Sequence, residues 1–254
     1  MDLLEKPVYN YIKNNHGVIT FRDMEELNFS YQQLNQLVSK GKVESIERGI
    51  YHLPDTYIDD YFSLQYRFPK GIYSLETALW LHGLSLTIPF EPVMTFPFGT
   101  NTRPMKEAGV KPIVARKYHE IGIIRLERQA GQFISGYDME RTLVECLRTA
   151  YHVDIQVIAP AFQAHFKKGA VDYAKLYHYA QLFKVTEKLQ SYVEVFSWTQ
   201  QILIVSRLKS RILQKKKGSL SQKISQIFEE YGANMLDVFG CYMYKLNNCV
   251  TMKP

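Results

Sequence analysis

The sequence predicts an α+β protein, and three observations support that fold class. Helical patterns alternate with short β-prone runs through the first 56 residues, four β-prone runs lie between residues 93 and 135, and helical patterns fill residues 138–196. Strand-rich segments followed by helices are typical of α+β domains. The expected regions are residues 1–56, 57–197 and a helical extension at 198–254.

The first region begins with two predicted helices separated by a short strand. Apolar residues at helical spacing predict a helix over residues 2–15, and residues 18–19 predict a strand fragment. Thr20 is a helix N-cap residue, and Asp23 three positions later completes a partial capping box. A second helix is therefore expected over residues 21–27.

A tight turn leads to a third helix. Asn28 tolerates the left-handed conformation that ends a helix, and Ser30 is the next N-cap. The third helix should run from Tyr31 to about Lys40 and end at Gly41.

A hairpin is predicted after the third helix. The β-prone runs at residues 43–47 and 50–54 flank Gly49, which supplies the positive φ of the turn. The order helix, short strand, helix, tight turn, helix, hairpin is that of a winged helix-turn-helix.

In such a unit the third helix is the element presented to the DNA major groove. Its outward face carries amides, which pair bidentately with adenine without the desolvation of a charge, and basic residues near the wing would contact phosphates. The candidate DNA-binding residues are Tyr31, Gln32, Gln33, Asn35, Gln36, Lys40, Lys42 and Arg48.

Two alternatives stay open for this region: a solvated Gln- and Asn-rich surface, or a winged helix that acts as a protein–protein adaptor. Residues 1–56 hold six Lys and Arg against eight Asp and Glu, a weak electrostatic footprint for DNA. We therefore expect tight binding to need the C-terminal domain or a second copy on an inverted repeat.

The second region is predicted to contain a set of strands that helices precede and follow along the chain. Ser74 is expected to cap a helix that Gly83 ends, and Asp138 to begin a helix reaching residue 148. The other predicted helices cover residues 57–67, 154–168, 172–183 and 185–196, and the strands cover 93–96, 112–116, 121–126 and 132–135.

Three segments are distinctive in their order and spacing: residues 47–54 (ERGIYHLP), 73–84 (YSLETALWLHGL) and 136–148 (GYDMERTLVECLR). Together they resemble the AbiEi antitoxins of bacterial abortive-infection toxin–antitoxin systems, over about residues 3–196. The resemblance implies a winged helix-turn-helix that binds inverted repeats in the promoter of its own operon, so that double-stranded DNA is a partner. It also implies an α+β C-terminal antitoxin domain that counteracts a nucleotidyltransferase-like toxin, by type IV antagonism that requires no stable complex.

Some charged residues of the second region are expected to make contacts within the protein rather than to bind a ligand. Arg141 is expected to pair with Asp138, Glu145 or a strand-end carbonyl; the alternative for Arg141 and Arg148 is a phosphate or toxin contact. His82 ends a helix, where the dipole favours a protonated imidazole, and is expected to be structural.

A basic cluster in the second region is either a second DNA or RNA contact or the solvated outer face of the sheet. Arg125 and Arg128 belong to this cluster. Its candidates for the second nucleic-acid contact are Arg103, Lys106, Lys111, Arg116 and Lys117.

The net charge of +6 lies in the last region. Residues 198–254 hold nine Lys and Arg against three Asp and Glu, whereas the remaining residues hold 22 of each sign. Part of this extension, residues 220–246, faintly resembles the opening helices of the partner toxins. It is expected to be a fused toxin fragment, an extra helical hairpin or a partly ordered end.

No pattern in the sequence indicates an enzyme, a cofactor or a metal site. The nucleophile-elbow, zincin, P-loop and dinucleotide-binding motifs are absent, no Asp-x-Lys or Glu-x-Lys occurs, and the three cysteines have no Cys-x-x-Cys spacing. The N-terminus has no export signal, and the longest aliphatic run, residues 202–205, is too short for a membrane span. We expect a cytoplasmic protein without catalytic activity.

Overall fold

The computed structural model describes residues 6–169 and 171–196, all of which lie in one compact unit. The predicted extension at residues 198–254, with Cys241 and Cys249, lies outside the described residues. Within the described part the chain is α+β, as the sequence predicted.

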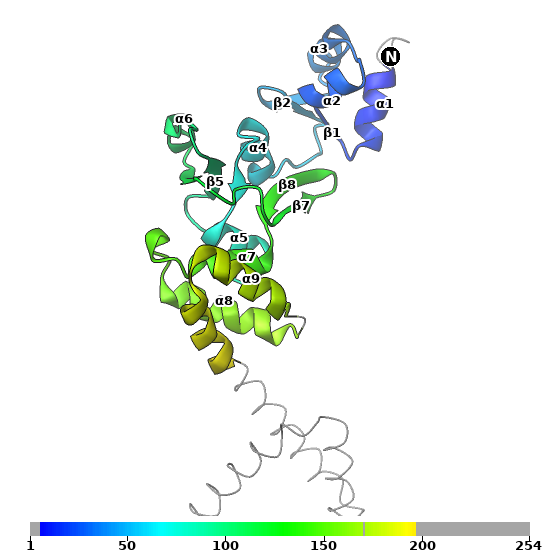
Figure 1. Cartoon of the computed structure of the whole chain (residues 1–254). Helices are drawn as coiled ribbons and strands as arrows, with labels where there is room; N and C mark the ends of the chain where they lie inside the picture. Colours follow the sequence, from blue (N-terminus) through cyan, green and yellow to red (C-terminus); the bar gives the residue numbers. More distant parts are fainter. Residues whose placement is uncertain (1–5, 170, 197–254) are drawn as a thin grey trace, which may run out of the picture. The chain divides into compact units, whose positions relative to one another are not determined.

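The N-terminal part has three helices and a small antiparallel sheet, an arrangement consistent with a winged helix-turn-helix (Figure 1). The strands lie in the order β1-β3-β2, so the hairpin β2–β3 pairs with the first strand. The elements are α1 (Lys6–Asn14), β1 (Val18–Thr20), α2 (Phe21–Glu26), α3 (Tyr31–Ser39), β2 (Glu44–Glu47) and β3 (Ile50–His52).

Local capping signals place the helices of this part. The Thr20 side chain accepts a hydrogen bond from the Asp23 N–H at 3.3 Å, and the Asp23 carboxylate accepts one from the Thr20 N–H at 2.7 Å, which confirms the capping box. Asn28 is left-handed with φ 53°, and the Ser30 hydroxyl accepts from the Gln32 N–H. Gly49 has φ 96° in the β2–β3 turn, as predicted.

A single apolar cluster holds the three helices against the sheet. Leu34 and Leu37 of α3 are fully buried in it, beside Ile12 of α1 and Met24 of α2. One face of α3 is therefore fixed inward by the two leucines, and the opposite face is left outside the cluster.

The following part is built on a five-stranded mixed sheet in the order β6-β5-β4-β8-β7. The predicted strands are present, and three elements were not predicted: the two-residue strand β4 at its centre, the short helix α6 and the 3-10 turn at residues 149–151. The strands are β4 (Ile72–Tyr73), β5 (Val93–Pro97), β6 (Lys111–Ala115), β7 (Ile123–Gln129) and β8 (Gln132–Tyr137). The helices are α4 (Asp60–Arg67), α5 (Leu75–Leu81), α6 (Arg103–Glu107), α7 (Met139–Cys146), α8 (Ile155–Lys167) and α9 (Tyr173–Phe183); residues 149–151 form a 3-10 turn, and residues 186–196 are helical.

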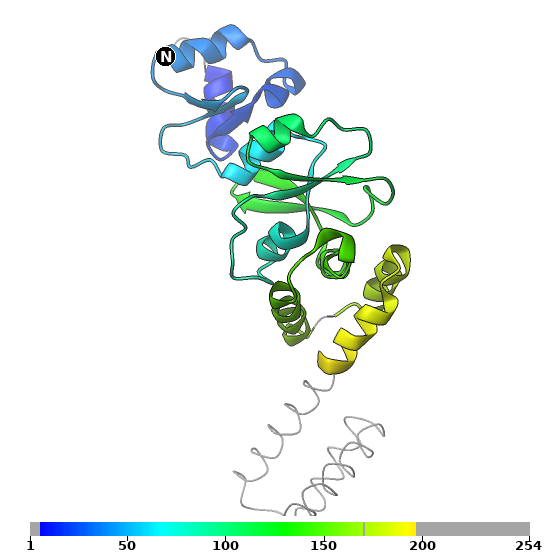
Figure 2. The same ribbon diagram turned by 90° about the vertical axis from the view of Figure 1, so that its left-hand side faces the viewer.

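Helices cover both faces of this sheet (Figure 2). Along β5 successive side chains alternate between two apolar clusters, because neighbouring residues of a strand point to opposite faces. Val93 packs in the cluster of α5, α7, α8 and α9, whereas Met94 and Phe96 pack in the cluster that includes α4 and α6 residues.

One predicted cap is wrong in its chemistry. Ser74 occupies the N-cap position of α5, but its hydroxyl makes no capping hydrogen bond. It accepts a hydrogen bond from the Thr95 hydroxyl at 2.8 Å, because β5 lies beside it in the buried interior. The side chain therefore joins α5 to the sheet.

Candidate nucleic-acid interface

The outward face of α3 is rich in side-chain amides. Gln32 and Asn35 are exposed, and Gln33 and Gln36 are half-buried. None of the four side chains has a hydrogen-bond partner among the described residues. Their donors and acceptors are therefore available to an external partner.

The position of each amide follows from the helix period of 3.6 residues per turn. Leu34 and Leu37 define the buried direction, and Gln32 lies about opposite to their mean direction, at about 100° per residue. Gln36 follows one turn later on the same face, whereas Gln33 lies at its margin. The structure thus places Gln32 at the centre of the outward face, with Asn35 and Gln36 about 50° to either side of that centre.

Tyr31 is partly engaged within the protein. Its ring makes an edge contact with Phe21 of α2, with 5.1 Å between centroids, and its hydroxyl donates to the Glu25 carboxylate at 3.4 Å. The Tyr31 side chain therefore packs between α2 and α3, and part of it remains on the surface. Lys40 is exposed at the C-terminal cap of α3.

The β2–β3 wing presents charges of both signs. Arg48 is exposed at the turn, and Lys42 is half-buried just before β2. Glu44 and Glu47 belong to β2, so two carboxylates accompany the two basic residues. A polyanion approaching the wing meets both attraction and repulsion.

The second basic set lies around one edge of the five-stranded sheet. Arg103 and Lys106 are on α6, Lys111 begins the edge strand β6, and Arg116 and Lys117 follow that strand. All five are exposed. The sequence cluster is nevertheless divided by the fold, because Arg125 and Arg128 are on β7 at the opposite edge.

Some members of this set already have partners. Arg103 pairs with Glu107 at 2.8 Å, and the Arg116 guanidinium lies 4.9 Å from the centroid of the Phe98 ring. Lys106 and Lys117 form no ion pair with any described residue. At the other edge Arg128 pairs with Asp59 at 3.2 Å, which assigns it a structural contact.

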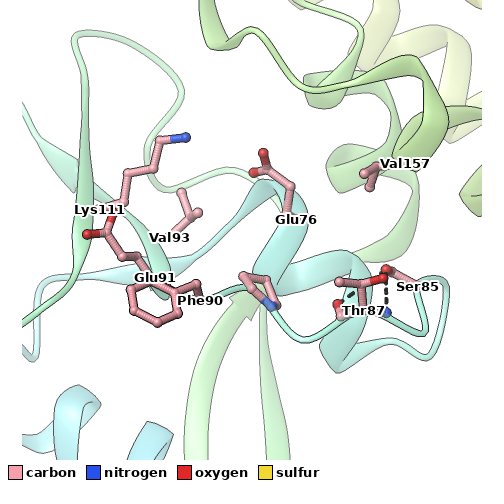
Figure 3. A pocket seen from close by; sticks show the side chains of 9 residues that line it. Glu76, Ser85, Thr87, Phe90, Glu91, Val93, Lys111 and Val157 are labelled. Carbon is pink, nitrogen blue, oxygen red and sulfur yellow. Dashed lines mark hydrogen bonds between the residues drawn. The ribbon is translucent and has the colours of Figure 1, made fainter.

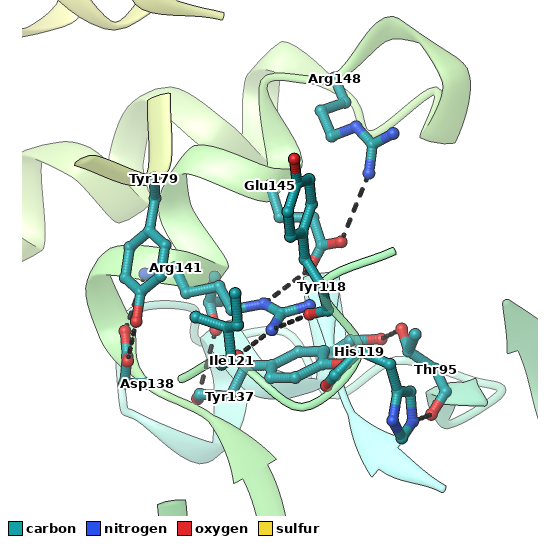
Figure 4. A network of polar contacts seen from close by, with 12 residues as sticks. Thr95, Tyr118, His119, Ile121, Tyr137, Asp138, Arg141, Glu145, Arg148 and Tyr179 are labelled. Carbon is teal, nitrogen blue, oxygen red and sulfur yellow. Dashed lines mark hydrogen bonds and ion pairs between the residues drawn. The ribbon is translucent and has the colours of Figure 1, made fainter. Parts of the chain in front are cut away.

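Arg141 is buried in a polar network rather than exposed to a ligand (Figure 4). Its guanidinium donates to the backbone carbonyls of Tyr118 and Ile121 and lies 3.6 Å from the Glu145 carboxylate. The expected intramolecular role is confirmed, with Glu145 and carbonyl groups as partners. Asp138 instead caps α7 by accepting from the Arg141 N–H at 2.8 Å.

Two neighbours complete this network. The Arg148 guanidinium donates to the Tyr151 hydroxyl at 2.8 Å and lies 3.7 Å from Glu145. Burial raises the pKa of Glu145, although Arg141 and Arg148 oppose that shift. Sequence reasoning missed the Tyr118 and Ile121 carbonyls, because no local pattern marks a backbone group more than a dozen residues away.

His82 is structural, as expected, and its Nε2 lies 2.7 Å from the Tyr137 carbonyl oxygen. Burial lowers its pKa, although the Tyr137 carbonyl and Asp138 oppose that shift, whereas a position at the end of a helix was expected to favour the protonated ring. Cys146 is a buried free thiol, and burial raises its pKa.

Comparison with known proteins addresses the N-terminal part directly. Residues 8–54, which run from α1 through the wing, match the family model described as a transcriptional regulator, AbiEi antitoxin. The N-terminal part is an AbiEi antitoxin transcriptional-regulator domain. The AbiEi domain therefore includes α3 and its amide face.

Other comparisons reach further along the chain. The crystal structure of the RV2827C protein from Mycobacterium tuberculosis is similar with a TM-score of 0.45 and 13% identity, over 71% of this chain and 72% of that one. No curated protein matches the chain. The AbiEi assignment thus rests on residues 8–54.

The described residues were also searched for metal-binding groups and for membrane-spanning helices. Within residues 6–169 and 171–196 no group of three His, Cys, Asp or Glu side chains is placed to hold a metal ion. In the same part of the chain, no helix has the length and apolar character to cross a membrane.

Proposed function

We propose that the protein is an antitoxin and transcriptional autorepressor that binds inverted repeats in the promoter of its own operon. The observation that carries this proposal is the amide face of α3, which lies opposite Leu34 and Leu37 and inside the segment that matches the AbiEi regulator model. A helix with one face fixed in the core and uncharged hydrogen-bonding groups on the other suits the floor of the major groove.

Gln32 and Gln36 are the central reading residues in this proposal. Each amide donates one hydrogen bond and accepts another, the pattern that adenine offers in the major groove. Asn35, Gln33 and Tyr31 border them on the same helix. Lys40, Lys42 and Arg48 would contact phosphates and fix the register of the helix on the duplex.

The acidic residues of the AbiEi domain make one copy a weak DNA ligand. Glu44 and Glu47 stand beside the wing lysine and arginine and reduce their attraction for phosphates. We therefore propose that the basic set at the β6 edge adds phosphate contacts, through Arg103, Lys106, Arg116 and Lys117. Lys111 is the weakest member of this set, because it lines a cavity together with two glutamates.

Residues 57–197 would supply the antitoxin activity against a nucleotidyltransferase-like toxin. The support is the AbiEi match of the N-terminal part and the resemblance of residues 73–84 and 136–148 to the same family. Buried Arg141 and Glu145, which belong to the second of these segments, stabilise this domain, so the surface that antagonises a toxin must lie elsewhere on it.

A gel-shift titration tests the DNA proposal. The affinity of the full chain is measured for its upstream promoter and, separately, for a scrambled duplex of equal length. Both titrations are repeated at rising salt concentrations. We expect specific binding with a steep salt dependence. Gln32→Ala with Gln36→Ala should reduce the preference for the promoter, by about tenfold or more if each pair contributes at least 1 kcal/mol.

Gln190→Ala is the matched control, since Gln190 is an exposed amide on the helix at residues 186–196, outside the AbiEi domain. Equal affinity for both duplexes would contradict the proposal and favour a protein–protein adaptor. Unchanged discrimination by the Gln32 and Gln36 variant would reject α3 as the reading helix.

The antitoxin proposal has a separate test. The neighbouring reading frame of the operon is expressed alone and together with this chain, and cell growth is measured. We expect growth arrest by the first and recovery with the second. The Gln32 and Gln36 variant should still restore growth, because toxin antagonism is assigned to residues 57–197; a failure of the wild-type chain to restore growth would contradict this assignment.

A further inference from the structure

The segment between α5 and β5 exposes several large apolar side chains. In residues 84–92, Leu86 and Phe90 are both 101% exposed, and Ile88 is 60% exposed. Monomeric proteins rarely leave neighbouring large apolar groups in water without a use for them, since such patches mark interaction sites. We refer to Leu86, Ile88 and Phe90 as the apolar loop.

A cavity of about 290 Å³ adjoins the apolar loop (Figure 3). Phe90 and Pro89 form part of its lining from the loop itself. Glu76 enters it from α5, Val157 from α8 and Lys111 from the edge strand β6. Phe90 of the apolar loop, a carboxylate and an ammonium group therefore line one cavity, and Leu86 and Ile88 alternate in sequence with its lining residues Ser85, Thr87 and Pro89.

The charged groups of this surface have no partner within the described chain. The Glu76 Oε2 atom is buried and has no hydrogen-bond partner. Glu91 and Lys111 are exposed, and neither forms an ion pair with a described residue. A half-buried carboxylate without a donor is costly unless a cation or hydrogen-bond donor completes it.

We propose that this surface docks onto the same surface of a second copy of the chain, around a two-fold axis. In such an isologous contact each residue of one copy meets its complement on the other. Lys111 of each protomer would lie against Glu76 and Glu91 of its partner, and Leu86 and Phe90 of the two copies would bury one another.

The charges on the surface favour a second copy over other occupants. The surface holds both signs, so it is complementary to itself. Nucleic acid would be repelled by Glu76 and Glu91, and a strongly basic protein would be repelled by Lys111. The inference does not rest on the proposed DNA binding, because the contact forms without DNA.

Sedimentation velocity of the full chain across micromolar concentrations, without DNA, is the first measurement. We expect a reversible dimer. Leu86→Glu with Phe90→Glu should raise the dimer dissociation constant by about tenfold or more, since these side chains form the apolar centre of the contact. Tyr57→Glu is the matched control, because Tyr57 is a large side chain, 66% exposed and outside the surface.

Exchanging the charges of Glu91 and Lys111 tests the proposed pairing between the two copies. Both side chains are exposed, so the substitutions should leave the fold intact. Glu91→Lys alone and Lys111→Glu alone should each weaken self-association, because each places like charges opposite one another. An equimolar mixture of the two variants should recover a heterodimer, since both pairs are then of opposite sign. Circular dichroism and thermal unfolding verify that every variant is folded.

Three results would overturn the proposal. The first is a wild-type chain that stays monomeric over the whole concentration range. The second is a dimer whose dissociation constant is unchanged in the charge variants, which would place the contact elsewhere in the chain. The third is a mixture of Glu91→Lys and Lys111→Glu that associates no better than either variant alone.

Discussion

The guanidinium of Arg141 lies over the ring of Tyr137, 3.3 Å from its centroid. Arg141 belongs to α7 and Tyr137 ends β8, so the stack connects the helix to the strand that precedes it. The same guanidinium binds carbonyl groups of residues 118 and 121. One buried side chain thus joins helix, strand and the segment that leads from β6 to β7.

Replacing Arg141 with Ala should destabilise the protein by about 3–5 kcal/mol, because Glu145 would lose a partner while it stays buried. Urea unfolding measures the loss. Arg103→Ala is the control: its ion pair with Glu107 is exposed, so the expected change is within about 1 kcal/mol. Equal effects of the two substitutions would contradict the structural role given to Arg141.

The pair can also be removed together. Arg141→Met with Glu145→Leu should cost less than the sum of the two single changes, since no unpaired buried charge remains in the double variant. Additive losses in a double-mutant cycle would show that the two side chains do not interact.

Stability should fall as the solution is acidified below about pH 6.5, the ordinary pKa of histidine. Burial lowers the pKa of His82 and of His165 in the folded protein. A lowered folded pKa means that the unfolded chain binds protons first, so the stabilisation is complete above the unfolded pKa. It declines as pH falls through the folded pKa.

Urea midpoints measured from neutral to mildly acidic pH test this expectation. His82→Gln and His165→Gln should each flatten the pH dependence, whatever they do to the absolute stability. His82 faces the Tyr137 carbonyl, Asp138, Glu140 and Lys168, while His165 faces Glu140, Lys168 and His82. An unchanged slope in both variants would reject the histidines as its source.

Gly49→Ala should destabilise the wing by about 1–2 kcal/mol. The residue has φ 96°, and an added Cβ would lie 2.7 Å from the Tyr66 hydroxyl oxygen. Gly41→Ala is the matched control, since Gly41 also has positive φ (64°) but no atom within 4 Å of the added Cβ. Thermal unfolding should therefore show a larger loss for Gly49, and equal losses would mean that the Tyr66 contact adds no cost.

Lys42→Ala with Arg48→Ala should weaken DNA binding for all sequences. The slope of log affinity against log salt should fall by about one for each phosphate contact removed. Lys6→Ala with Lys13→Ala, two exposed lysines on α1, serves as the control of equal charge within the same N-terminal part. A loss of sequence preference without a change of slope would assign the two residues to base readout instead.

Local sequence signals predicted the helix caps and the turn of the N-terminal part, because these depend on residues only a few positions apart. Thr20 with Asp23, Ser30 and Gly49 all behave as their neighbours in sequence require. By contrast, the two-residue strand β4 has no pattern long enough to detect, and it forms because β5 and β8 pair with it on either side.

The candidate site was predictable to a similar degree. The outward amides of α3 follow from its helix period, which places Gln32 opposite the leucines and Asn35 and Gln36 on either side of it. The grouping of basic residues was not predictable, since sheet order separates β6 from β7 although they are consecutive strands.

By itself, the sequence determined most of the helices and strands, the wing turn and the amide face, because these depend on periodicity and on backbone conformation within a few residues. Tertiary structure decided that Ser74 binds Thr95, that Arg141 is buried, and that Leu86 and Phe90 are left in water, with Phe90 lining the same cavity as Glu76. Such relations join residues far apart in the chain, and only the packing of whole elements sets the distances between them.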